Sequence, residues 1–550
     1  MKHFIIIFIS FFILSTNQAQ TMKTAFTNGK IFTVNEKQPS AECVIVEGNK
    51  IIFVGSNKES KKLIDADTKI IDLNGRLMLP GFNDNHVHFI SGGFYLLGID
   101  LRPAISTSEF KSILKSYSEK YPGKWITGGY WDHEKWETKD LPTKEMIDEV
   151  VSNQPVFVDR LDGHMAVANS YALKLAGITK YTQSPEGGLI VKDPKTGEPT
   201  GVLKDNAMSL INNLIPEPTD EENYSALIVA LDEAKKLGIT SVQDITYQDA
   251  LTTFQKAKDE GKLTCRIFTR WPIADYDYLV KNHLSIGSGD ESIRFGSLKA
   301  FADGSLGSST AWFFEKYEQD TSTFGLPMDI ITDGSLEKWS LDADKNHLQL
   351  SVHAIGDRAN SYMLDLYEKI TKENPKWDRR FRIEHSQHVR FEDVKRFAEL
   401  GVIASVQPYH CIDDGVWAEK RIGHERIKYT YPFKSFLDAG VKLCFGTDWY
   451  VAPLNPLLGI YAAVTRRTLD NKNPDGWIPE QKISVEDAIK CYTLNSAYAS
   501  FEENIKGSIE VGKLADLIVL SEDILSIDPI KIKDVVVDMT VFDGKIVFKR

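Results

Sequence analysis

Short apolar segments that end in polar side chains recur eight times between residues 79 and 448. Their interiors are nearly continuous hydrophobic runs, which is typical of strands buried on both faces. Amphipathic stretches separate them, as at 226–237, 334–346, 360–372 and 391–400. Eight successive β/α units predict a TIM barrel, with an open doubly wound sheet as the alternative. The eight segments are 79–88, 238–244, 265–271, 296–304, 350–357, 380–385, 401–408 and 441–448.

The two ends of the chain differ from this middle part. Both contain short β-rich runs separated by turn dipeptides such as Asn74-Gly75 and Asp543-Gly544. We therefore expect one small β-sandwich built from both termini, and a large insertion after the first barrel strand, on the active-site face. The expected limits are 20–78 and 506–550 for the β-sandwich, 79–100 for barrel strand one, 101–220 for the insertion, interpreted as a lid or recognition subdomain, and 221–505 for the rest of the barrel.

The N-terminus has the pattern of a secretory signal peptide. A short basic start precedes the apolar run 4–14, and small polar residues follow it. Eleven apolar residues are too few for a comfortable membrane span. We expect cleavage near Ala19, so that 1–19 is removed and the mature chain is exported, to the periplasm or the medium, without a stable membrane anchor. An uncleaved N-terminal anchor is the alternative.

Charge and cysteine content exclude several classes of protein. The chain has 65 basic and 77 acidic residues, a net charge of −12, and no block of Lys or Arg. Nucleic-acid binding therefore has no electrostatic support, and a small-molecule substrate is the expected partner. The five Cys are far apart and form no CxxC motif, so neither a disulfide scaffold nor a Cys-based zinc site is predicted.

Histidines and an aspartate stand at the ends of the predicted barrel strands. His86 and His88 alternate on strand one, so that both imidazoles face the same side. His353, His385 and Asp448 end strands five, six and eight. The carboxyl ends of barrel strands converge on one pocket. His and carboxylate ligands in that pocket favour zinc or a similar divalent metal.

Lys299 lies inside the apolar strand 296–304. A buried, unpaired Lys is costly and tends to become neutral. A neutral Lys beside two metals can add carbon dioxide and become an anionic carbamate that bridges them. The structural alternative is a salt bridge inside the barrel, for instance with Asp303.

Five motifs together resemble the metal-dependent amidohydrolase superfamily. They are PGFNDNHVH, KAFADGSLG, HAIGDRA, RIEH and FGTDW. Their order is similar to that of amidohydrolase family 3, the branch that contains N-substituted formamide deformylase, and the resemblance covers nearly the whole mature chain. Members have a distorted TIM (β/α)8 barrel beside a small β-sandwich, which agrees with the α/β fold predicted above.

The resemblance also implies a ligand set and a mechanism. His86, His88 and Asp448 would bind one metal, His353 and His385 a second, and carboxylated Lys299 would bridge them. Two zinc ions per chain are expected, although some relatives hold one. Asp448 would be the catalytic proton shuttle, taking a proton from the nucleophilic hydroxide and giving it to the departing nitrogen. Glu384, or another group, would orient His385.

Substrate contacts are sought in the insertion and at strand ends. The candidates are Trp131, Asp132, Arg160, His164, Asp303 and Gln407. Several of them have a structural alternative. Arg160 could instead form an ion pair with a neighbouring Asp, and Asp303 could brace the site. The aromatic residues of the insertion could pack in its core.

The predicted function is hydrolysis of a non-peptide C–N bond of the amide type. The alternatives are a related metal-dependent hydrolase of an ester or carbamate, and a non-catalytic binding or regulatory protein on the same fold. A homodimer is a further possibility that the sequence leaves open.

Overall fold

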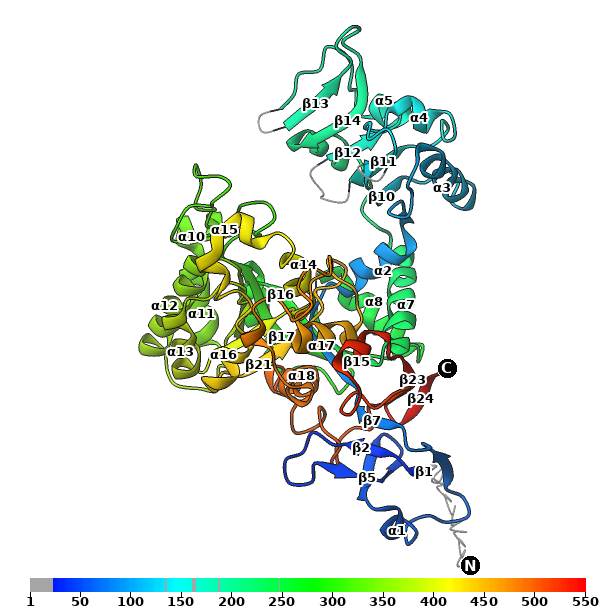
Figure 1. Ribbon diagram of the computed structural model, residues 1–550, viewed down its shortest axis with the longest axis vertical. Helices are drawn as coiled ribbons and strands as arrows, with labels where there is room; N and C mark the ends of the chain where they lie inside the picture. The colour runs from blue at the N-terminus through cyan, green and yellow to red at the C-terminus, as the bar shows by residue number, and fades with distance from the viewer. Residues whose placement is uncertain (1–22, 134–135, 161–164, 186–187, 247) are drawn as a thin grey trace, which may run out of the picture.

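A parallel eight-stranded sheet forms the centre of the molecule (Figure 1). The computed structural model describes residues 23–550, apart from 134–135, 161–164, 186–187 and 247. A parallel bridge between Val87 and Trp449 joins the first and last strands, so the sheet is a nearly closed barrel and the TIM-barrel prediction is confirmed. In spatial order the strands are β21 (Leu443–Phe445), β20 (Ile403–Val406), β19 (Arg382–His385), β18 (Gln349–Ala354), β17 (Ile293–Phe301), β16 (Arg266–Pro272), β15 (Ile239–Ile245) and β8 (Phe82–Val87).

Helices cover the outside of this barrel. The four helices expected from their amphipathic pattern are present. One of them, α7 (Asp220–Lys236), begins at a capping box in which Thr219 and Glu222 satisfy each other's backbone amides. Their buried faces join the large hydrophobic cluster that surrounds the sheet. The main barrel helices are α2 (Phe89–Leu97), α7 (Asp220–Lys236), α8 (Gln248–Asp259), α11 (Ser335–Lys345), α12 (Asp357–Glu373), α13 (Phe391–Leu400), α14 (Pro408–Asp414), α17 (Pro456–Thr465), α18 (Val485–Cys491) and α19 (Leu494–Ala499).

The segment expected as one strand at 79–88 is two strands in the structure. β7 (Leu77–Pro80) belongs to a terminal sheet, and β8 begins the barrel at Phe82. Gly81 separates them, and its backbone passes so close to Thr240 that a Cβ atom would lie 2.1 Å from the Thr240 hydroxyl. Only glycine fits this crossing between the two sheets.

The terminal strands form two facing sheets, as predicted. Ile518 in the C-terminal part pairs with Leu79 in the N-terminal part, so residues from both ends share one sheet. Side chains of both sheets, such as Phe26 and Val519, meet in one core. One sheet contains β5 (Lys50–Gly55), β4 (Cys43–Glu47), β1 (Lys23–Thr27) and β6 (Lys69–Asp72); the other contains β24 (Lys545–Lys549), β23 (Val537–Phe542), β22 (Leu517–Leu520), β7, β2 (Lys30–Phe32) and β3 (Ser40–Ala41).

The insertion has a sheet of its own and projects beyond α2 at the top of Figure 1. Hydrophobic clusters built around Trp131 and Phe157 lie on its two faces. The sheet contains β13 (Gly188–Lys192), β14 (Pro199–Asp205), β12 (Met165–Ala168), β11 (Val156–Arg160), β10 (Ile126–Trp131) and β9 (Ile99–Asp100), with helices α3 (Thr107–Lys120), α4 (Lys144–Asp148) and α5 (Ser170–Leu175).

All five cysteines lie among the described residues and are buried and free, so the fold contains no disulfide scaffold. Within the described ranges, no helix combines the length and apolar character needed to cross a membrane. The predicted signal peptide, 1–19, lies outside the described residues.

Candidate metal centre

The strand-end histidines meet at the carboxyl end of the barrel. Nε2 of His86 and Nε2 of His88 each lie 3.5 Å from the same oxygen, Oδ1 of Asp448. Ligand atoms about 2.0–2.2 Å from a tetrahedral zinc ion are separated by roughly 3.3–3.6 Å. The two imidazoles and the carboxylate therefore have the separation that one metal ion requires.

Glu384 fixes the orientation of His86. Its Oε2 accepts a hydrogen bond from Nδ1 of His86, which leaves Nε2 directed at Asp448. Arg270 and Arg382 lie 2.9 and 3.0 Å from its other oxygen. Burial opposes ionisation of Glu384, but the two arginines and His86 hold its pKa well below the usual range. Of the two options for orienting His385, Glu384 or another group, the structure does not support Glu384, because its carboxylate bonds to His86.

Burial keeps these imidazoles neutral, the form that binds metal. It lowers the pKa of His86 to about 3, with Lys299 adding to the effect. It acts in the same direction on His353, whose pKa falls to about 4. The pKa of His385 is also well below its ordinary value. Burial opposes ionisation of Asp448, yet the neighbouring imidazoles hold its pKa low, so the carboxylate is charged.

The second predicted group lies beside the first. The ring of His385 is 4.4 Å from that of His353 and 5.0 Å from that of His86, centre to centre. Nε2 of His353 is 3.0 Å from the carbonyl oxygen of Gly304, so Nδ1 is its ring nitrogen available to a metal. His385 and Asp448 have left-handed backbones, with φ of 71° and 57°. Such strain in non-glycine residues is typical of functional sites.

Lys299 is buried in β17 between these groups. Among the described residues, its Nζ has no hydrogen-bond partner. Burial lowers its pKa to about 7, against the attraction of Glu384 and Asp448. The alternative of a salt bridge to Asp303 is wrong, because that carboxylate accepts hydrogen bonds from the backbone amides of three loop residues: Trp312, Ile355 and Gly356. A buried amine without a partner, next to paired metal donors, fits a site completed by a metal.

His410 is the residue of this centre that sequence reasoning missed. It lies in the first turn of α14, just beyond β20, and its Nε2 is 4.0 Å from Oδ2 of Asp448. His385, His410 and Asp448 form a second group of donor atoms within 4.8 Å of one another. The signal in the sequence was an imidazole three positions after the strand-end Gln407, in the segment QPYH.

Two predicted substrate contacts, Trp131 and Asp303, are held by hydrogen bonds within the fold. Trp131 is enclosed in the core of the insertion, and its indole N–H donates to the carbonyl of Val158 at 2.8 Å. Asp303 braces the start of α12 through backbone amides. These placements fit the alternatives considered above, core packing for Trp131 and a bracing role for Asp303, and substrate contact by either residue stays a prediction.

The other predicted contacts are more varied. Arg160 and Asp132 form an ion pair at 4.0 Å, which is the alternative considered for Arg160. Gln407 is buried at the N-cap of α14, directly after β20. Its contact with a substrate stays a prediction. His164 lies outside the described residues.

Two aromatic side chains flank the centre and were not predicted. Phe301 is 40% exposed, with its ring 5.1 Å from the His353 ring and 4.7 Å from Nζ of Lys299. Tyr450 is 38% exposed and lies 6.3 Å from the His88 ring. Tyr450 also stacks on Tyr95 of α2, which contacts Tyr130 of the insertion at 5.6 Å. Exposed aromatic groups thus lie on two sides of the donor cluster.

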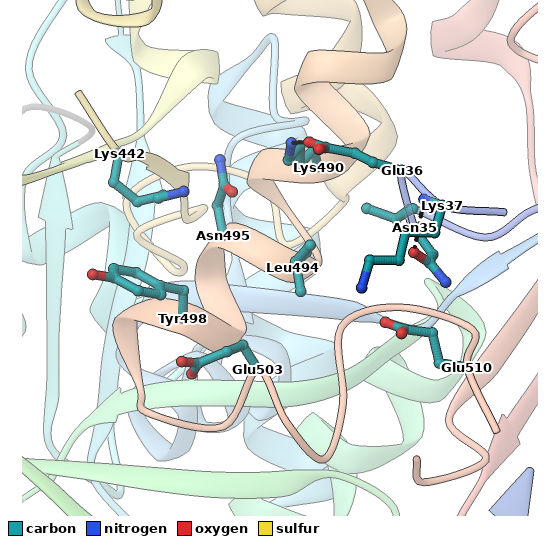
Figure 2. A pocket seen from close by; sticks show the side chains of 11 residues that line it. Asn35, Glu36, Lys37, Lys442, Lys490, Leu494, Asn495, Tyr498, Glu503 and Glu510 are labelled. Atoms are coloured by element: carbon teal, nitrogen blue, oxygen red, sulfur yellow. Dashed lines mark hydrogen bonds and ion pairs between the residues drawn. The ribbon is translucent and has the colours of Figure 1, made fainter. Parts of the chain in front are cut away.

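A cavity of about 350 Å³ lies elsewhere, between the β-sandwich and the barrel (Figure 2). Figure 2 shows side chains of both charges along it, and Lys490 forms a 2.7 Å ion pair with Glu36. Lys442, which precedes β21, places it at the amino end of the barrel strands. The cavity is therefore separate from the donor cluster at their carboxyl ends.

Comparison with known proteins agrees with this geometry. The family model described as "Amidohydrolase family" matches residues 69–548. The chain is 38% identical over 509 residues to Protein LONG AFTER FAR-RED 3 of Arabidopsis thaliana, covering 90% of this chain and 86% of that protein. It is 26% identical over 546 residues to the N-substituted formamide deformylase of Arthrobacter pascens, covering 95% and 98%.

A solved structure shares the fold over most of the chain. It is the crystal structure of an uncharacterised metal-dependent hydrolase from Pyrococcus horikoshii, with a TM-score of 0.78 and 30% identity, covering 92% of this chain and 99% of that one. The family match and this structural similarity agree with the donor cluster at the barrel strand ends. The chain belongs to the amidohydrolase family of metal-dependent hydrolases.

Proposed function

We propose that this chain hydrolyses a non-peptide C–N bond of the amide type, with divalent metal bound at the centre described above. The observation that carries the proposal is the convergence of His86 Nε2 and His88 Nε2 on one oxygen of Asp448. The name of the Arthrobacter relative, a formamide deformylase, supports the choice of bond.

The ligand set proposed is the one expected from the sequence. His86, His88 and Asp448 would hold one zinc ion, and His353 and His385 a second. Lys299 would bridge them as a carbamate, because its neutral amine is the form that reacts with carbon dioxide. When bound, the metal supplies a nucleophile at neutral pH and polarises the carbonyl.

The residues of the chain move and hold the protons. Asp448 accepts a proton from the attacking water as the oxygen bonds to the carbonyl carbon. It then gives that proton to the nitrogen as the C–N bond breaks, so that the products are a carboxylic acid and an amine. Glu384 holds His86 in one tautomer through Nδ1. The buried arginines keep Glu384 charged for this task.

The first experiment is elemental mass spectrometry of mature protein produced with zinc and bicarbonate, beside Lys299→Ala. We expect two zinc equivalents in the parent and one or fewer in the variant. A panel of N-formyl, N-acyl and cyclic amides, with ester and carbamate analogues, then identifies the bond. Zinc-loaded, folded protein that cleaves no C–N bond on this panel contradicts the proposal. Folded protein that binds no metal points instead to a non-catalytic binding protein.

Export of the chain and action on a small molecule, not on nucleic acid, belong to the same proposal. The N-terminal pattern of 1–19 supports an exported chain, to the periplasm or the medium. N-terminal sequencing of the protein recovered outside the cytoplasm should begin at Gln20. Light scattering on the same sample tests the homodimer that the sequence left open.

A further inference from the structure

His410 faces the metal centre without belonging to the predicted ligand set. Its Nε2 atom is buried and has no hydrogen-bond partner in the described part of the chain. Asp448 lies close to it in the centre, with Oδ2 4.0 Å from Nε2. A buried donor with no partner costs free energy, so it is retained where a ligand satisfies it.

The two oxygens of Asp448 face different neighbours. Oδ1 lies 3.5 Å from both His86 and His88, which is the separation of two ligands of one metal. Oδ2 lies 4.0 Å from His410, which is too far for a direct hydrogen bond. An oxygen atom placed about 2.8 Å from both Oδ2 and Nε2 would make an angle of about 90° between them. The separation therefore suits one bridging oxygen between Asp448 and His410.

We propose that His410 is a substrate-binding residue that, together with Asp448, holds the oxygen added to the substrate carbonyl. The Nε2–H of His410 donates to this oxygen, and the oxygen donates its own proton to Oδ2 of Asp448. In the addition intermediate the same oxygen is a hydroxyl on the former carbonyl carbon. This inference rests on the proposed hydrolysis and adds to it a residue outside the metal ligands.

The surroundings of His410 agree with a donor role on this side. Asp413 and Asp414 lie on its own helix, α14, where burial raises the pKa of both carboxyl groups and the neighbouring His410 opposes that rise. The carboxylate of Asp414 is already held by Gln387 and by the Tyr431 hydroxyl, at 2.7 and 2.6 Å. Asp414 therefore has partners of its own on α14, and the carboxylate within 4.0 Å of the His410 Nε2 atom is that of Asp448.

The test measures binding of methylphosphonate, whose tetrahedral oxygens resemble the addition intermediate. Zinc-loaded parent, His410→Leu, His410→Gln and the control His424→Gln are compared by calorimetry, and zinc per chain is measured in each. His424 is an exposed histidine that pairs with Glu419, so its replacement controls for loss of an imidazole. Circular dichroism identifies any variant that is not folded.

We expect His410→Leu to bind methylphosphonate roughly ten- to a hundredfold more weakly, with zinc content unchanged. His410→Gln, which keeps an N–H donor, should recover part of the affinity, and His424→Gln should match the parent. Unchanged affinity in folded His410→Leu overturns the proposal, as does a zinc-loaded parent that does not bind the probe. Loss of zinc in both His410 variants also overturns it and makes His410 a metal ligand. Normal His410-dependent binding without turnover of any amide would contradict the proposed function alone.

Discussion

The side chain of Glu384 on β19 accepts a hydrogen bond from Nδ1 of His86 on β8, across the interior of the barrel. The two residues are separated by 298 positions in the chain, and both are buried. The same carboxylate contacts Arg270 and Arg382 inside the barrel. Glu384 therefore has two roles: it neutralises two buried arginines, and it sets the orientation of the His86 ring. Barrel stability and metal affinity should therefore change together when Glu384 is replaced.

Glu384→Gln removes that negative charge and leaves two buried arginines uncompensated. We expect a loss of about 3 kcal/mol in the free energy of unfolding and a ten- to hundredfold weaker zinc affinity. Urea denaturation and competition with a zinc chelator measure the two effects. Glu419→Gln, in an exposed Glu–His pair, is the matched control and should change neither. Normal zinc affinity in Glu384→Gln would show that His86 needs no orienting partner.

Lys299→Met should alter the pH dependence of stability in metal-free protein. The pKa of Lys299 is about 7 in the folded chain, against 10.5 ordinarily, so the unfolded chain binds more protons between these values. The free energy of unfolding of the parent should thus increase as the pH rises from 7 to 10.5. Below pH 7 the buried amine is protonated, and its burial destabilises the fold to the full extent. Lys299→Met should lack this gain. Urea midpoints at pH 6.5, 8 and 9.5 measure it, and parallel curves for both proteins would contradict it.

Asp303→Ala tests the bracing role assigned to this carboxylate. It would leave the backbone amides of Trp312, Ile355 and Gly356 without their acceptor. We expect a loss of about 3 kcal/mol in the free energy of unfolding, with a smaller loss for Asp303→Asn, which keeps one acceptor. Zinc content should stay at the parental level at temperatures where the variant is folded. Once a substrate is found, a raised KM with unchanged stability would restore Asp303 as a substrate contact.

Phe301→Ala and Tyr450→Ala should alter the choice among substrates. Both rings are exposed beside the donor cluster, where an apolar substituent of the amide would lie. We expect kcat/KM for N-benzyl amides to fall about tenfold relative to N-methyl amides, because one lost apolar contact costs that much discrimination. Leu326→Ala, at another exposed apolar position, is the control. Equal losses for both amides would assign the rings a structural role.

The barrel and the donor residues were predictable because both follow from strand periodicity. His86 lies on β8 and His88 directly follows its last residue, and barrel strand ends converge, so their approach to Asp448 could be expected from the strand pattern. The partner of Glu384 was not predictable in this way. Its carboxylate bonds to His86 on another strand, and its neighbour His385 has a left-handed φ of 71° that strand periodicity does not indicate.

Other features depend on contacts between distant segments. The break at Gly81 follows from the approach of Thr240, and the exposure of Phe301 depends on how the loops around the barrel opening fold. His410 lies in the first turn of α14, after the end of β20. The alternation of a strand therefore does not tell which way its side chain points. The sequence shows these residue types but not the neighbours that give them their roles.

The pairing of β7 with β22 has a consequence for biosynthesis. β7 leads through Gly81 directly into β8, which contains His86, and its partner Ile518 is translated more than 400 residues later. A chain still held by the ribosome before that point can pair β7 with β2 but lacks β22, and β8 meets Trp449 only after most of the chain has been made. We therefore expect metal to be acquired by the completed polypeptide, not during its elongation.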